Sequence, residues 1–222
     1  MNYTIIADES ILENFIESLP DLESGEKYYM ALFARKKYDP TSINSSDRVQ
    51  LGRVIVKKEH IIRKLKNWEI PLGAYKLKGK EVNQISLAAY INPNPRSQKK
   101  AARIMMHKLT DLISGTNLDY DLVREAYSSL QVSKSRGVYV DFDLDVEKPF
   151  DLSKLKEIMD GGYRVLETRG GYHILIEPTK VTNTKTWYKQ IQDNFPVDKQ
   201  GDQMIPIPGT YQGGFTPKFI NI

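Results

Sequence analysis

Residues 138–145 read VYVDFDLD, and this stretch decides how the second half of the chain folds. Strand-forming residues alternate with aspartate, and side chains alternate between the two faces of a β-strand. Asp141, Asp143 and Asp145 therefore share one face. Val140, Phe142 and Leu144 point to the other face and predict a buried core.

Carboxylates crowded on one strand face repel each other, so folding them together is unfavourable unless protons or a divalent cation offset the repulsion. Aspartate is also a poor strand former. The pattern therefore predicts a use for these acids, such as holding Mg²⁺ or Mn²⁺. The alternative is an exposed strand end whose acids spread into water. Asp145 is nearest that end and is the least expected member of a site.

Residues 168–177 read TRGGYHILIE and predict a hairpin whose turn is Arg-Gly-Gly. Paired glycines permit positive φ and let a ligand approach backbone N–H groups. Arg169 adds a charge suited to phosphate. His173 is suited to hydrogen bonding a phosphate or to proton transfer. An ordinary turn followed by a surface or capped histidine is the alternative.

Residues 197–202 read VDKQGD, and a PGT turn follows at 208–210. Asp198 or Asp202 is a candidate for a further carboxylate in the same site, and the residues alone leave the choice open. An ordinary turn-rich connection is the alternative interpretation of this segment.

The predicted order of elements from residue 137 onward is β-α-β-β-α-β, typical of a ferredoxin-like or RNA-recognition-motif-like sheet. Before it, helical spacing and strand-forming runs predict a mixed α/β lobe. We expect an α/β (α+β) protein in which a basic lobe of residues 1–115 packs against an RNA-recognition-motif-like lobe of residues 116–222 as one compact unit. The predicted elements are strands at 3–6, 27–35, 73–77, 85–91, 137–144, 163–168, 172–177, 205–207 and 215–220, and helices at 9–19, 57–68, 98–114, 121–130, 151–159 and 184–194.

Composition narrows the chemistry. The 222 residues include no cysteine, which excludes disulfides, cysteine zinc sites, iron–sulfur clusters and a thiol nucleophile. With three histidines, any metal site must rest mostly on carboxylates, which favour Mg²⁺ or Mn²⁺. No apolar run approaches the roughly 18–20 residues of a bilayer span, and no signal peptide is evident. We therefore expect a cytoplasmic protein with no membrane association.

Charge is distributed unevenly along the chain. Residues 27–110 hold 19 Lys and Arg against five Asp and Glu, whereas residues 111–222 hold 13 bases and 16 acids. A basic half joined to an acidic half suggests that one surface attracts a polyanion while another holds a cation. Solvated helix faces are the alternative, and residues 57–66 fit that description well.

Together these motifs resemble the archaeo-eukaryotic primase, or primase–polymerase, superfamily. The likeness covers about residues 136–212, and residues 1–115 match only as an expected mixed α/β partner lobe. The whole chain also resembles proteins from mobile elements of Bacteroidetes-type bacteria, a likeness that implies no chemistry. The matching motifs, in chain order, are Asp141 with Asp143, GGYH at 170–173, Val197 with Asp198, and PGT at 208–210.

The resemblance implies a nucleotidyl transfer to a 3′-hydroxyl on a template, with DNA or RNA, nucleoside triphosphates and replication proteins of a mobile element as partners. Mg²⁺ or Mn²⁺ would bind Asp141, Asp143 and Asp198, with Asp202 as the other candidate. His173 would contact the triphosphate. Further candidate nucleotide ligands are Arg169, Gly170, Gly171, Lys134 and Arg136. Candidate nucleic-acid contacts are Arg35, Lys36, Lys37 and Arg96.

Two other functions remain open at this point. One is a non-catalytic module that binds single-stranded nucleic acid, and the other is a metal-dependent nuclease that uses the same acids. No motif of a serine hydrolase or of a Rossmann enzyme is present.

Overall fold

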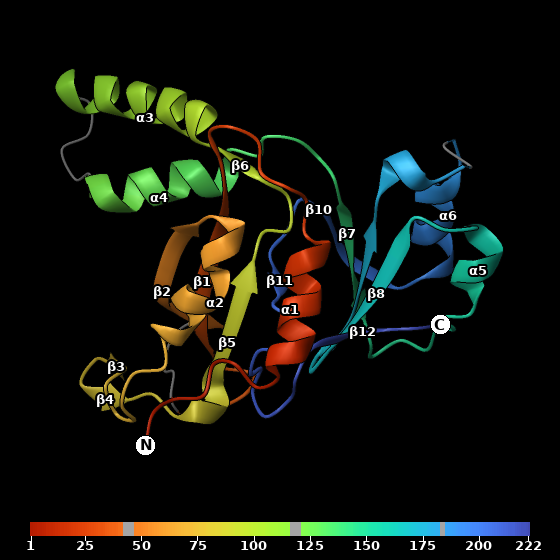
Figure 1. The fold of residues 1–222 in the computed structure, drawn as a ribbon, viewed down its shortest axis with the longest axis horizontal. Helices are drawn as coiled ribbons and strands as arrows, with labels where there is room; N and C mark the ends of the chain where they lie inside the picture. The colour runs from red at the N-terminus through yellow and green to blue at the C-terminus, as the bar shows by residue number, and fades with distance from the viewer. Residues whose placement is uncertain (42–46, 116–120, 183–184) are drawn as a thin grey trace.

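The structure is a computed structural model that describes residues 1–41, 47–115, 121–182 and 185–222. Within them the chain is mixed α/β, with antiparallel sheets and six α-helices (Figure 1). The helices are α1 (Glu9–Ser18), α2 (Ile61–Lys66), α3 (Gln98–Ile113), α4 (Leu122–Val132), α5 (Lys154–Ile158) and α6 (Trp187–Asn194). The strands are β1 (Glu26–Arg35), β2 (Arg48–Val56), β3 (Lys76–Leu77), β4 (Lys80–Glu81), β5 (Leu87–Ile91), β6 (Arg96–Ser97), β7 (Val140–Asp145), β8 (Tyr163–Thr168), β9 (Gly171–Ile176), β10 (Val197–Gly201), β11 (Ile205–Pro206) and β12 (Lys218–Ile220).

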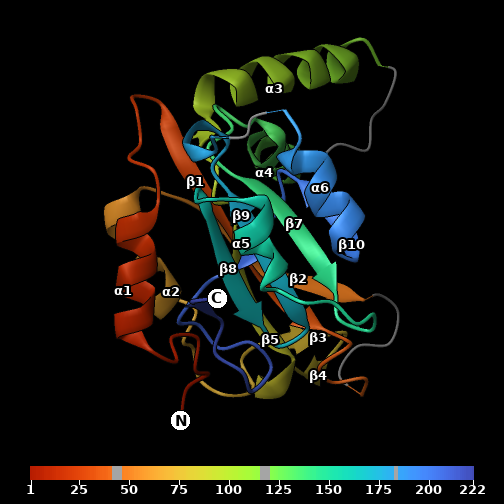
Figure 2. The same ribbon diagram turned by 90° about the vertical axis from the view of Figure 1, so that its right-hand side faces the viewer.

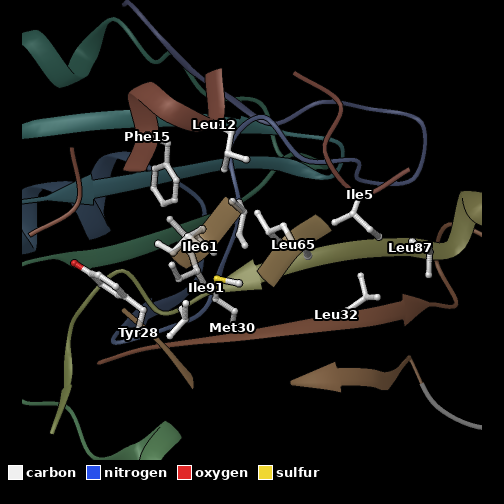
Figure 3. Close-up of a cluster of buried hydrophobic side chains, with 14 of the residues drawn as sticks. Ile5, Leu12, Phe15, Tyr28, Met30, Leu32, Ile61, Leu65, Leu87 and Ile91 are labelled. Atoms are coloured by element: carbon white, nitrogen blue, oxygen red, sulfur yellow. The ribbon is translucent and has the colours of Figure 1, made fainter. Parts of the chain in front are cut away.

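The first sheet has the order β11-β5-β1-β2, and β6 pairs with the start of β1. β1 is almost entirely buried because both of its faces are covered. Helices α1 and α2 cover one face, where Leu12, Phe15, Ile61 and Leu65 pack against Met30 and its neighbours (Figure 3). Burial of these side chains is the main driving force for this lobe.

The second sheet has the order β10-β7-β9-β8-β12, and every neighbouring pair is antiparallel. Helices α5 and α6 lie on the same side of it (Figure 2). Phe142 and Ile174 from the strands join Leu155 of α5 and Ile191 of α6 in one core cluster. The alternation in β7 therefore sends its apolar residues to the helices and its acids to the opposite face.

Helix α1 lies between the two sheets (Figure 1). Leu166 and Leu175 of the second sheet belong to the same core cluster as the α1 residues. The rings of Phe15 in α1 and Phe219 in β12 are 6.2 Å apart. This end of the inner face of the second sheet is therefore closed by apolar packing.

Several predicted elements are confirmed, among them α1, β1 and the two strands of the hairpin. Residues 3–6 are not a strand, because only isolated bridges form at Asn2 and Ile6. The predicted helix at 57–68 is a 3₁₀ turn, Lys58–His60, followed by α2. The predicted helix start at residue 184 lies outside the described residues, and α6 begins at Trp187.

Four strands, β2, β4, β6 and β10, were not predicted, and two of them, β2 and β10, matter for the site. β2 pairs with residues 28–35 of β1 across a bulge. Residues 197–201, interpreted above as part of a turn-rich connection, form β10 and pair with β7. Residues 205–206 pair instead with β5 of the first sheet. The last strand of the β-α-β-β-α-β series is thus β10 and not the predicted strand at 205–207.

Within the part of the chain described here, no helix combines the length and apolar character needed to cross a membrane.

Gly209 occupies a position that only glycine fits. Its φ is +77°, and a Cβ there would lie 2.5 Å from the backbone oxygen of Asp8 and the backbone nitrogen of Leu12. The Gly209 carbonyl also accepts hydrogen bonds of 2.9 Å from the N–H groups of Ala7 and Asp8, so the loop cannot shift without losing them.

We expect Gly209→Ala to lower the free energy of unfolding by more than about 2 kcal/mol, because positive φ alone costs about 1–2 kcal/mol and a backbone clash adds to it. Gly25→Ala is the matched control, with φ +78° and nothing within 4 Å of the added Cβ. Urea unfolding of both variants measures the difference. Equal losses in the two variants would contradict the packing described at Gly209.

Candidate functional site

The two predicted acids of β7 and the histidine of the hairpin lie together. Asp143 of β7 and His173 of β9 are direct cross-strand partners, and Asp141 stands opposite Leu175 two pairs further along. All of these side chains project from the face that α5 and α6 leave uncovered. Strand register thus brings together what the sequence separates by 32 residues.

Asp141 and His173 form a buried pair. The Asp141 side chain is 1% exposed, and its Oδ2 and Oδ1 atoms lie 3.0 and 3.1 Å from Nδ1 of His173. Nε2 of the same ring lies 3.7 Å from Oδ1 of Asp143. The imidazole therefore stands between the two carboxylates, and its Nδ1–H donates to Asp141.

Burial and charge act on this pair in opposite directions. Burial alone lowers the pKa of His173, but the Asp141 carboxylate outweighs it, and the net pKa of His173 is raised. Burial likewise raises the pKa of Asp141 despite the nearby imidazole. The pair therefore holds its proton more tightly than an isolated histidine does.

A cavity of about 650 Å³ opens between the two sheets beside this pair. Asp143, Thr168, His173 and Lys199 form the wall contributed by the second sheet. The opposite wall comes from the first sheet, on the face away from α1 and α2, and includes Tyr90. The face of the second sheet opposite α5 and α6 is therefore covered by α1 at one end and lines the cavity at the other.

Positive charge dominates the cavity wall. Its cationic side chains are Arg35, Lys37, Arg48 and Lys199. Desolvation, together with the charges of Arg35, Arg169 and Lys199, lowers the pKa of Lys37, while Asp143 opposes the change. Such crowding of cations is relieved by an anion, so the cavity is suited to a multiply charged anion such as a phosphate chain.

Three buried polar atoms on residues that line the cavity have no hydrogen-bond partner among the described residues. They are Nε of Arg35, Oδ1 of Asn92 and Nε2 of Gln203. Buried polar atoms are nearly always satisfied by protein, water or ligand. Because solvent does not reach these three atoms, they do not themselves face the cavity.

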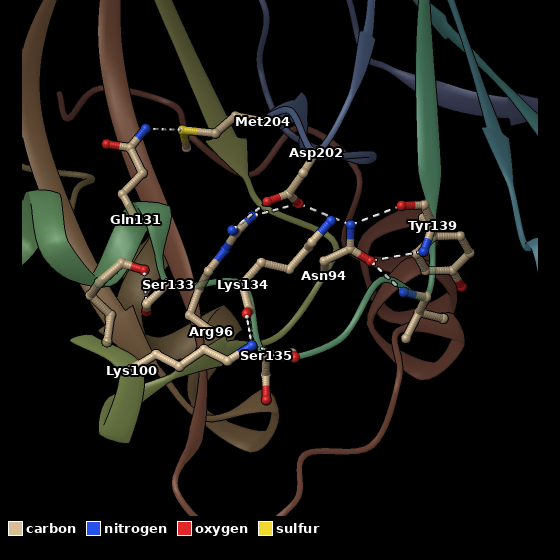
Figure 4. Close-up of polar contacts among 12 residues, drawn as sticks. Asn94, Arg96, Lys100, Gln131, Ser133, Lys134, Ser135, Tyr139, Asp202 and Met204 are labelled. Atoms are coloured by element: carbon tan, nitrogen blue, oxygen red, sulfur yellow. Dashed lines mark hydrogen bonds and ion pairs between the residues drawn. The ribbon is translucent and has the colours of Figure 1, made fainter. Parts of the chain in front are cut away.

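Asp202 lines the cavity but is already engaged. Arg96, whose side chain is 1% exposed, donates from Nη1 and Nη2 to its two oxygens at 2.6 and 2.8 Å (Figure 4). Asn94 donates from Nδ2 to Asp202 and to the Tyr139 carbonyl, both at 2.9 Å. Asp202 thus holds a structural ion pair at the edge of the cavity.

Asp198, the other candidate third carboxylate, lies at the bulge of β10. Its side chain is 56% exposed, and Oδ2 lies 3.4 Å from Nζ of Lys199. Among the described residues that line the cavity, Asp202 is present and Asp198 is not. The side chain of Asp145 lies outside what the structure describes.

The predicted turn residues lie at the mouth of the cavity. Gly170 lines it, and a Cβ there would lie 2.7 Å from Nζ of Lys37. The Gly170 N–H donates to Oγ1 of Thr168 at 3.3 Å, and Gly171 pairs with Asp145. The Arg169 guanidinium lies 4.6 Å from the centre of the Tyr38 ring. It also donates to the carbonyl of Gly213.

The remaining predicted basic residues are dispersed. Arg96 is fully buried in its pair with Asp202. Arg136 pairs with Glu26 and donates to the Asp21 carbonyl, at the end of the first lobe. Lys134 is exposed, and Lys36 is half-buried. Of the four predicted nucleic-acid contacts, the structure brings Arg35 and Lys37 to the cavity.

Sequence reasoning missed Arg48, Lys199, Tyr90 and Asn92. Lys199 is the direct partner of Asp143 across β10 and β7, so a strand assignment for residues 197–201 would have found it. Arg48 likewise pairs with Arg35 across β2 and β1. No local signal marks Tyr90 or Asn92, whose position depends on the pairing of β5.

Comparison with protein-family models, curated proteins and solved structures finds no match for this chain.

The side chains present partly fit a divalent cation. Within the described residues, no group of three or more His, Cys, Asp or Glu side chains is arranged to hold a metal. Mg²⁺, however, commonly binds through one or two carboxylates, substrate phosphates and water. Asp143, with a side chain 34% exposed beside the cationic wall, meets that requirement, and Asp141 is the second carboxylate on its face.

Removing Asp202 should destabilise the protein strongly. Asp202→Ala leaves the buried Arg96 guanidinium without its carboxylate, and we expect the free energy of unfolding to fall by about 3 kcal/mol. Asp198→Ala, at an exposed carboxylate four residues earlier, should change it by less than about 0.5 kcal/mol. Chemical denaturation of both variants provides the test, and similar losses would contradict the structural role of Asp202.

The Asp141–His173 pair predicts a pH-dependent signature. In the wild type the pKa of His173 should lie above the ordinary value of about 6.5, and Asp141→Asn should lower it, because burial and the charge of Lys37 are then opposed by Asp143 alone. The wild-type pair adds stability that is full below about pH 6.5 and is lost as pH rises through the folded pKa. NMR titration of the imidazole protons checks this, with exposed His107 as internal control. An unchanged midpoint in the variant would rule out the coupling.

Proposed function

We propose that this protein is a metal-dependent nucleotidyltransferase of primase–polymerase type that adds nucleotides to a nucleic-acid 3′ end. One observation carries the proposal. Asp143 and His173, paired on adjacent strands, face a cavity whose lining also includes four cationic side chains, Arg35, Lys37, Arg48 and Lys199. A nucleoside triphosphate needs both parts, since cations neutralise its phosphates and hard carboxylates hold the accompanying metal ion.

The topology of the second sheet supports the same proposal. Four of its five strands, β10-β7-β9-β8, with α5 and α6 on one side, follow the β-α-β-β-α-β order of an RNA-recognition-motif-like sheet. The acids lie on β7, an interior strand, where neighbouring strands hold their positions. A site on interior strands is placed more accurately than one on loops.

A divalent cation would be held by Asp143, with Asp141 as the second carboxylate. Mg²⁺ or Mn²⁺ bound there would neutralise phosphate charge and favour attack by the 3′-hydroxyl. The chain's own side chains would orient the nucleotide. Lys37 and Lys199 line the cavity and would neutralise the triphosphate. His173, positioned by Asp141, also lines the cavity and would donate a hydrogen bond to the triphosphate.

A non-catalytic module that binds single-stranded nucleic acid is the second candidate. It is favoured by the engagement of two predicted metal carboxylates with other side chains, Asp141 with His173 and Asp202 with Arg96. A nuclease that uses the same acids is distinguished from a nucleotidyltransferase by the length of its product, because a nuclease would shorten the strand.

Asp143→Asn tests the leading proposal. The substitution keeps the size of the side chain and removes the charge that would hold the cation. We expect Mn²⁺- or Mg²⁺-dependent extension of a primed template to fall at least a hundredfold, about 2.7 kcal/mol in the activation free energy. Asp193→Asn, at an exposed acid of α6, is the control and should keep full activity.

Thermal unfolding of both variants shows whether the fold persists. Full extension activity in a folded Asp143→Asn protein would refute the proposal. Oligonucleotide binding by a wild type that incorporates no nucleotide would instead favour the non-catalytic module.

A further inference from the structure

A second charged surface continues from the cavity along the first sheet. Cross-strand pairs place Arg35 beside Arg48, Phe33 beside Gln50, and Ala31 beside Arg53 on one face. Partners in an antiparallel pair share a face, so the three arginines lie on the side away from α1 and α2. The six positions named, all within the described chain, include no acidic residue.

Aromatic rings are interleaved with these arginines. The Arg48 guanidinium carbon lies 5.1 Å from the centre of the Phe33 ring, and that of Arg53 lies 4.5 Å from the centre of the Tyr127 ring in α4. A guanidinium stacked on a ring keeps N–H groups available for phosphate oxygens. It also offers a flat surface on which a nucleobase can stack.

The surface includes a second hollow beyond the cavity. Gln50, Gly52, Arg53 and Arg124 are among the residues that line this hollow of about 370 Å³. Arg48, which lines the cavity itself, lies five positions along β2 from Arg53, or roughly 17 Å at the rise of a strand. Cavity and hollow therefore follow one after the other along the edge strand of the sheet.

We propose that this arginine–aromatic face, formed by Arg48, Gln50, Arg53, Arg124 and Tyr127, binds the single strand that leads into the cavity. The inference rests on the proposed function, in which that strand is the template. Charge complementarity favours a polyanion, and planar stacking partners favour one that carries bases. An acidic protein segment would use the charges alone.

The test is binding of a labelled oligothymidylate, measured by fluorescence anisotropy without nucleotide or metal. We expect Arg53→Gln with Arg124→Gln to weaken binding at least tenfold. The slope of log K against log salt should fall by about 1.4, as for the loss of two phosphate contacts on a single strand. The matched control removes two exposed charges from the β3–β4 hairpin, as Lys76→Gln with Lys80→Gln, and should change affinity less than twofold.

A second variant separates stacking from charge. Arg53→Lys with Arg124→Lys keeps both charges and loses the planar groups, so affinity should fall while the salt slope stays unchanged. Wild-type affinity and slope in the glutamine variant would overturn the proposal. The proposal would also be overturned if the wild type bound labelled polyglutamate as tightly as the oligonucleotide and the glutamine variant lost that binding. The surface would then bind an acidic protein.

The two proposals fail separately. If the wild type binds the oligonucleotide through Arg53 and Arg124 yet extends no primer, the surface stands and nucleotidyl transfer falls. If the wild type extends primers and the glutamine variant binds normally, the template lies elsewhere and this inference falls.

Discussion

The structure depends on a buried polar junction at the point where the chain passes between its two sheets. Arg96 and Asn94 follow β5 of the first sheet and are almost wholly inaccessible to solvent. Asn94 accepts hydrogen bonds from the N–H groups of Val138 and Tyr139 and donates to the Tyr139 carbonyl, which fixes the chain just before β7. Arg96 holds Asp202 just after β10. Because a buried guanidinium without its carboxylate is very unfavourable, the junction fixes where both strands begin and end. This junction therefore helps to position Asp141 and Asp143 on β7.

From this junction the two faces of the second sheet have different environments. One face packs its apolar residues under α5 and α6, and the other is shared between α1 and the cavity. The structure shows where the unevenly distributed charges of the sequence lie. The basic half supplies Arg35, Lys37 and Arg48, and the acidic half supplies Asp143 with its neighbour Asp141. Opposite charges from distant parts of the chain thus meet across one cavity, in which His173 stands between the two carboxylates.

Local pattern was sufficient for part of this arrangement. Alternation in residues 140–145 gave the strand and its two faces, and the paired glycines at 170–171 gave the hairpin that brings His173 opposite Asp143. Other features depend on distant partners. β10 reads VDKQG, a polar edge strand with no alternation, so it has no strand signature. β2 contains the strand-forming run Val54–Val56, but Gly52 interrupts its pattern. Arg96 is buried in an ion pair with Asp202, which is 106 residues away along the chain, so no local pattern reveals it. A choice between Asp198 and Asp202 therefore required the tertiary structure.

The proposed function requires that a nucleoside triphosphate and a divalent cation bind in the cavity together. Crystals grown with a non-hydrolysable nucleoside triphosphate and Mn²⁺ test this requirement, because the anomalous signal of manganese locates the ion without reference to any assumed ligand. We expect a manganese peak within coordination distance of a carboxylate oxygen of Asp143, with triphosphate density against Lys37 and Lys199. Nucleotide and manganese bound outside the cavity, or a cavity that holds only water at saturating nucleotide, would contradict it.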